Sequence, residues 1–113
     1  MKTASIFQDL ILKEKGPAIS VLFETSFTKE IRIAMKKGQS MKEHKTSYPI
    51  VVHIVSGEIE FGLPDSALDL EEGNLIALEG NIPHSLIAKK DSIFRLTLTK
   101  SDETQRVRKV VEG

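Results

Sequence analysis

The amino-acid sequence predicts an all-β protein, an antiparallel sandwich or barrel, on the basis of three observations. About eight short stretches are apolar at alternate positions or throughout. Turn-forming residues separate these stretches, and no long stretch between them has helical periodicity. Short strands joined by polar turns, without a long helix, are typical of this class of fold. At 113 residues the chain has a common size for one domain, so a single domain, 1–113, is expected.

The first two strands are expected at residues 19–23 and 30–36, where apolar residues occupy alternate positions. Residues 50–55 are apolar at odd-numbered and even-numbered positions alike, apart from His53. Both faces of this strand are therefore expected to be covered. The domain core covers one face of this strand. A partner subunit is expected to cover the other face, because monomers rarely expose an apolar patch of this kind, and we therefore expect a homodimer.

Shorter apolar stretches predict the remaining strands, at residues 59–63, 68–70, 75–78, 84–88 and 94–98. Alternation within all these strands predicts an apolar interior made of Ile31, Ile33, Met35, Ile50, Val52, Phe61, Phe94 and Leu96.

Both ends of the chain allow two interpretations. Ser5 and Gln8 have the spacing of a capping box, so the N-terminal arm, residues 1–18, is expected as a short helix or as an irregular arm on the sheet. In the C-terminal tail, residues 101–113, acidic residues come early and basic residues late, which suits a terminal helix. The valines of the tail favour extended chain instead.

Composition excludes several classes of function. Sixteen Lys plus Arg balance sixteen Asp plus Glu, so the chain has no general attraction for phosphate backbones or anionic lipid, and neither a nucleic acid nor a membrane is expected as a partner. The chain has no cysteine, which excludes disulfides, zinc–thiolate sites and thiol nucleophiles. The N-terminus does not resemble a signal peptide and no apolar run is long enough to span a membrane, so a cytoplasmic location is expected.

One stretch contains all three histidines and begins with a recognisable motif. Gly38 and Gly57 stand at the two ends of this motif, and His44 follows the first glycine by six positions. This spacing resembles the first motif of the cupin superfamily, G-x5-H-x-H-x3-E-x6-G. Thr46 stands where the motif has its second histidine, and Ile50 stands where it has a glutamate.

The second cupin motif, G-x5-P-x-G-x2-H-x3-N, is matched in its spacing at Gly73 and His84. Glu79, Asn81 and Ala88 replace the proline, the second glycine and the asparagine. The chain thus resembles both motifs in length and in part of their residues.

The resemblance covers about residues 29–100 and is closest to the small single-domain cupins of the RmlC-like type. It implies a jelly-roll barrel, also called a double-stranded β-helix. It also supports the homodimer, because small cupins commonly pair through sheet edges or outer faces.

In cupins, the two histidines and the glutamate of the first motif and the histidine of the second hold a divalent metal, which is iron, manganese, nickel or zinc. Only His44 and His84 carry over, so the resemblance implies a metal that is absent or weakly held. His53 is a third ligand only if a bulge shifts its strand by one residue. Otherwise it points outward, toward a subunit interface.

Two functions from different classes remain open, and whether the protein is an enzyme is undecided. The first is the binding of a small molecule in the barrel pocket, with His44 and His84 as polar anchors. The second is a metal-dependent oxygenase, isomerase or lyase that acts on a small oxygen-rich substrate. The predicted ligand-binding residues are His44, Thr46, Ile50, Val52 and His84.

Overall fold

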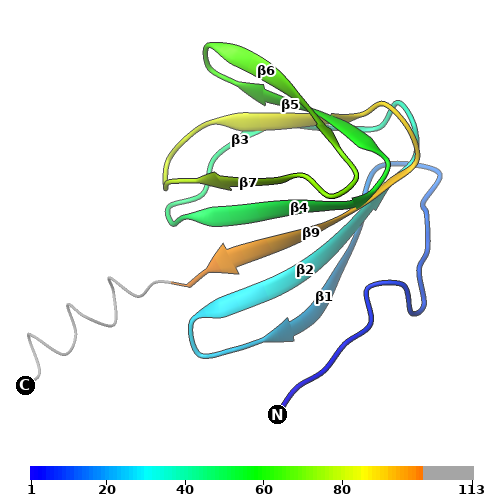
Figure 1. Cartoon of the computed structure of the whole chain (residues 1–113), viewed down its shortest axis with the longest axis vertical. Coiled ribbons are helices and arrows are strands. Elements are labelled where there is room, and N and C mark those ends of the chain that lie inside the picture. The colour runs from blue at the N-terminus through cyan, green and yellow to red at the C-terminus, as the bar shows by residue number, and fades with distance from the viewer. Residues whose placement is uncertain (101–113) are drawn as a thin grey trace, which may run out of the picture.

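The computed structural model describes residues 1–100, which form nine strands in two antiparallel sheets (Figure 1). The five-stranded sheet has the order β1 (Ala18–Glu24), β2 (Thr28–Met35), β9 (Ser92–Thr99), β4 (Ile50–Ser56) and β7 (Leu75–Leu78). The four-stranded sheet has the order β3 (Ser40–His44), β8 (His84–Ala88), β5 (Glu58–Leu63) and β6 (Ser66–Glu71). The predicted all-β class is confirmed.

The path of the chain is that of a jelly roll. The chain crosses between the sheets six times. Four of these crossings join β2 to β3, β4 to β5, β6 to β7 and β8 to β9, and the other two join β3 to β4 and β7 to β8. The order β2-β9-β4-β7 in one sheet therefore corresponds to the order β3-β8-β5-β6 in the other. No backbone ladder joins the two sheets within residues 1–100, so the predicted barrel is an open sandwich.

The core lies between the sheets and consists of the side chains on their facing sides. Among the residues predicted for the interior, all except Leu96 are at most 7% exposed, and Leu96 is partly buried against them. The structure adds further core residues, namely Ile54, Ile59, Leu70, Leu78, Leu86 and Ala88. Strand alternation therefore identified the buried face correctly.

Two corners of the jelly roll meet at Gly57, between β4 and β5. A Cβ atom on Gly57 would lie 2.2 Å from Oγ of Ser92, at the start of β9. That hydroxyl accepts a hydrogen bond from the N–H of Glu58 at 3.0 Å and donates one to the carbonyl of Lys90 at 2.7 Å. With φ at 94°, Gly57 supplies both the turn and the close approach.

The N-terminal arm forms an isolated turn at residues 6–9 and not the short helix that the capping-box spacing allowed. The guanidinium of Arg32, a residue of β2 that is 6% exposed, donates to the carbonyls of Ile6 at 3.1 Å, Gln8 at 2.7 Å and Asp9 at 3.3 Å. These hydrogen bonds hold the arm on the sheet as an irregular segment, so the irregular arm is the alternative that forms.

The terminal helix considered for residues 101–113 lies outside the described residues. Within residues 1–100, no helix is long and apolar enough to cross a membrane.

Candidate ligand-binding site

The site is formed by His44 and His84, which the fold brings from distant positions to adjacent strands. His44 is the last residue of β3 and His84 the first residue of β8, and the two are direct partners in the antiparallel register. Their ring centroids are 4.4 Å apart, with an angle of 64° between the planes. The two residues that match the cupin histidines therefore make one site.

Both imidazoles are held by the same local arrangement. Nδ1 of His44 lies 2.6 Å from the carbonyl oxygen of Lys42, and Nδ1 of His84 lies 2.9 Å from that of Ile82. A carbonyl oxygen only accepts hydrogen bonds, so each Nδ1 carries the proton and donates it. In the neutral ring, Nε2 then presents a lone pair, and the described residues offer neither Nε2 a hydrogen-bond partner.

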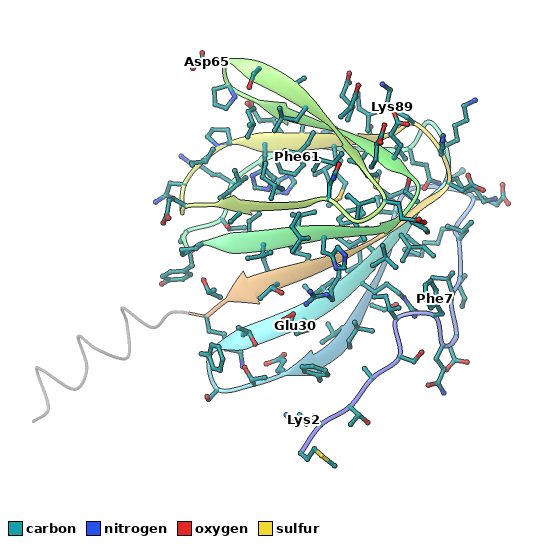
Figure 2. All side chains as sticks on the ribbon, viewed as in Figure 1. Lys2, Phe7, Glu30, Phe61, Asp65 and Lys89 are labelled. Atoms are coloured by element: carbon teal, nitrogen blue, oxygen red, sulfur yellow. The ribbon has the colours of Figure 1, made fainter. Side chains whose placement is uncertain are left out.

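The two rings differ in their exposure. His84 is 4% exposed and lies nearly parallel to Phe61, with centroids 5.6 Å apart and planes at 6°. Phe61, labelled in Figure 2, belongs to the core between the sheets. Burial lowers the pKa of His84, as does the neighbouring His44, while the hydrogen bond to the carbonyl of Ile82 acts in the opposite direction. His84 is therefore held as the neutral base, beneath an exposed His44.

An open depression of about 300 Å³ adjoins the pair on the side of His44. Its lining residues are Glu43, His44, Lys45 and Pro83. This volume is at the lower end of the usual range for ligand sites.

The other predicted ligand-binding residues do not line this depression. The hydroxyl of Thr46 donates to the carbonyl of Tyr48 at 2.9 Å, and the carbonyl of Thr46 accepts from the N–H of Asn81 at 2.6 Å. Thr46 thus ties two loops beside the histidines. Ile50 and Val52 are core residues, 3% and 2% exposed.

His53 is not brought together with the other two histidines. It lies on β4 between the buried residues Val52 and Ile54 and therefore points to the outer face of the five-stranded sheet, opposite Arg95 and Leu75. The irregularity of β4 falls after Ile54 and does not shift His53. Its Nδ1 atom is buried without a hydrogen-bond partner among the described residues.

The donor set does not fit the metal site that cupins commonly contain. Within residues 1–100, no group of three or more His, Cys, Asp or Glu side chains is placed to hold an ion. The hydroxyl of Thr46 is hydrogen-bonded to the carbonyl of Tyr48, and the side chain of Ile50 has no atom that could bind a metal. Two imidazoles alone leave most of the coordination positions of a transition metal to water.

Two features of the site were not predictable from sequence patterns. The first is the pair of carbonyl acceptors, each two residues before its histidine. Every residue has a carbonyl, so nothing in the sequence marks these two. The second is the stacking partner, Phe61, which the alternation identified only as a core residue.

Solved structures with the same fold include cupins and a protein with a double-stranded β-helix domain. An RmlC-like cupin from Desulfovibrio desulfuricans superimposes with a TM-score of 0.80 at 19% identity, covering 88% of this chain and 96% of the other. A conserved protein with a double-stranded β-helix domain from Klebsiella pneumoniae gives a TM-score of 0.81 at 17% identity, covering 90% of this chain and 92% of the other. A conserved protein of unknown function from Streptococcus pyogenes gives 0.77 at 22% identity, covering 89% of each chain.

These likenesses show that the chain has the cupin fold, the double-stranded β-helix jelly roll implied by its two motifs. No protein-family model matches the sequence, and no curated protein matches it either.

Proposed function

We propose that this protein binds a small organic molecule at the paired imidazoles of His44 and His84. The observation that carries the proposal is the common tethering of the two rings: each Nδ1 donates to a backbone carbonyl, and each Nε2 is left with a lone pair. When both rings are neutral, two acceptors side by side suit a ligand with hydrogen-bond donors, such as a hydroxyl, amide or ammonium group.

The surroundings support a small ligand that enters from the side of His44. The depression beside that ring is open, about 300 Å³ in volume, and includes one carboxylate and one ammonium group, those of Glu43 and Lys45. The buried and stacked His84 fixes the position of the pair, because its ring is packed on Phe61. Preorganised groups of this kind lose little entropy on binding.

The metal-dependent enzyme is the second candidate. Its support is the same tether, since metal-binding histidines usually donate their second ring N–H to a carbonyl or carboxylate. It ranks second because the described residues supply two ligands where cupins use four. We therefore derive no catalytic step through a metal.

Fragment binding monitored by NMR tests the proposal. A panel of small diols, hydroxy acids and amino alcohols is added at millimolar concentration to protein that has been treated with chelator, and the imidazole signals are recorded. At least one class of fragment should shift the signals of His44 and His84. The shift should be lost in His44→Ala and kept in His53→Ala, which removes the imidazole on the outer face of the other sheet. Fragments that leave both signals unchanged, or that bind His44→Ala equally well, would contradict it.

A further inference from the structure

The two sheets of the sandwich are unequal, and one strand has no counterpart across the core. Four strands of the larger sheet, β2, β9, β4 and β7, correspond to β3, β8, β5 and β6 in the smaller sheet. β1 lies beyond β2 at the outer end of its sheet (Figure 1). The position opposite β1, next to β3, is not filled by any strand within residues 1–100. The inner face of β1 is therefore open.

The side chains on this open face are apolar. Ile19 and Val21 are the register partners of Ile33 and Ile31, so they lie on the same face of the sheet as two core residues. Ile33 and Ile31 are 2% and 7% exposed, but Ile19 and Val21 are 57% and 52% exposed. Phe27, in the turn between β1 and β2, is exposed as well. An apolar surface that continues the core in this way indicates that a further segment covers it.

The last described residue lies beside this surface. The N–H of Lys100 donates to the carbonyl of Phe27 at 2.9 Å, and its ammonium group donates to that of Thr25 at 2.7 Å. The same ammonium group lies 2.9 Å from a carboxylate oxygen of Glu24, the last residue of β1. In Figure 1 the end of β9 and the turn between β1 and β2 lie at the same end of the sheet. The C-terminal tail, residues 101–113, therefore starts at the end of β1.

The tail is long enough to reach both exposed side chains of β1. Ile19 lies six residues before Thr25, which corresponds to about 20 Å of strand. The thirteen residues of the tail span about 20 Å as a helix and about 40 Å as extended chain. Val21 is two residues closer to the start of the tail, so it is within reach in either conformation.

The tail also has apolar residues at a suitable spacing. They are three valines, Val107, Val110 and Val111, and most of the other residues of the tail are charged. Val107 and Val111 are four positions apart, so they share a face in a helix and in an extended chain alike. In both conformations the tail can cover an apolar surface with these two valines while its charged side chains stay in water.

We infer that residues 101–113 fold back over β1 of the same chain and cover Ile19 and Val21 with Val107 and Val111. The tail then occupies the position next to β3 that no described strand fills. This contact buries apolar side chains from both segments, which is the main favourable contribution to such an association.

The arrangement places the tail beside the strand that carries His44. The N–H of Thr99 donates to the carbonyl of Pro49 at 3.3 Å, in the loop that follows His44. A tail that starts there and covers β1 runs next to β3, whose last residue is His44. The inference rests on the open face of β1 and on the position of Lys100, so it stands whether or not the histidines bind a ligand.

Thiol reactivity in the full chain tests the contact. The chain has no cysteine, so Val21→Cys introduces a single thiol. A covered thiol reacts only when the tail opens, so it should react with a maleimide at least about tenfold more slowly than the thiol of Leu75→Cys. Leu75 is the matched control because it is 60% exposed, as Val21 is 52% exposed, but lies on the outer face of β7.

Substitutions in the tail then identify the cover. In the Val21→Cys chain, replacing Val107 and Val111 together by serine should raise the reaction rate to that of Leu75→Cys. Glu112→Ser is the control, because Glu112 shares a face with neither valine in a helix or in an extended chain, and it should leave the thiol protected. The protection should not depend on protein concentration, since the cover belongs to the same chain.

Trypsin gives a reciprocal test with the thiol-free chain. The tail contains three residues after which trypsin cleaves, namely Arg106, Arg108 and Lys109. Ile19→Ser and Val21→Ser should each accelerate cleavage in the tail by a factor of about five or more, because they weaken the surface on which the tail lies. Leu75→Ser should leave the rate unchanged.

Three results would overturn the inference. A Val21→Cys thiol that reacts as fast as that of Leu75→Cys would show that β1 is uncovered. Protection that survives the loss of Val107 and Val111 would show that the tail is not the cover. Protection that disappears on dilution would assign the cover to a second copy of the chain.

Discussion

His84 lies nearly parallel to Phe61, with ring centroids 5.6 Å apart, so an ionisable side chain is packed into the apolar core. The hydrogen bond to the carbonyl of Ile82 satisfies Nδ1. Burial nevertheless disfavours the charged ring and lowers its pKa below the ordinary value of 6.5. The same residue thus limits stability at low pH and supplies a neutral acceptor to the proposed site.

The lowered pKa of His84 predicts that stability falls as the medium is acidified. In the window between the folded pKa and about pH 6.5, the unfolded chain binds more protons than the folded chain, so the free energy of unfolding rises with pH. Above that window the stabilisation is complete. Urea denaturation of the wild type and of His84→Phe at several pH values measures the effect. The wild type should lose more stability than the variant on acidification, and parallel curves would contradict the assignment.

The two glycines at the ends of the first motif predict different costs for the same substitution. Gly57 and Gly38 have φ values of 94° and 89°, so alanine is strained by about 1–2 kcal/mol at either position. A Cβ atom at Gly38 meets nothing within 4 Å, whereas one at Gly57 lies 2.2 Å from Oγ of Ser92. Gly57→Ala should therefore lose a further 1–3 kcal/mol or so to overpacking. Equal losses in chemical denaturation would show that the two corners are not in close contact.

Arg32 is predicted to hold the N-terminal arm on the sheet. Its guanidinium donates to three arm carbonyls, and hydrogen bonds to a charged group are worth about 1.5–3 kcal/mol each. Arg32→Met keeps a side chain of similar length but has no donors. Trypsin should then cleave after Lys13 and Lys15 at least about tenfold faster, since about 1.4 kcal/mol corresponds to a factor of ten. Arg95→Met, which removes an arginine that does not contact these carbonyls, should leave the cleavage rate unchanged.

The fold was predictable because its signals are repeated along the chain. Alternation marks the inner face of each strand, and glycine occupies the corners at Gly38, Gly57 and Gly73, each with positive φ. The conformation of the N-terminal arm could not be predicted from its own residues. The capping-box spacing competes with the guanidinium of Arg32, which lies 24 positions from Gln8 in the sequence. The exposure of Ile19 was not predictable either, since it depends on the number of strands in the opposite sheet.

The site was predictable in its two histidines and not in their surroundings. Motif spacing placed His44 and His84 together because both motifs are tied to corners of the jelly roll, and the register pairs the two residues directly. The orientation of each ring depends on a backbone carbonyl, and the lowered pKa of His84 depends on its burial in the core beside Phe61. Both follow from the path of the folded chain and not from residue type.

The last prediction concerns metal, because metal content separates the two candidate functions. An imidazole holds an ion tightly only when further donors complete the coordination, and residues 1–100 contain no third side chain in position. Protein purified without a histidine tag should therefore contain well under one equivalent of iron, manganese, nickel or zinc by elemental analysis. Any metal that is present should be lost in His44→Ala and in His84→Ala. His53→Ala should leave the metal content unchanged, because its ring is on the outer face of the other sheet. A full equivalent that survives dialysis against a chelator would require ligands from outside the described pair. It would then favour the metal-dependent enzyme over the binding protein.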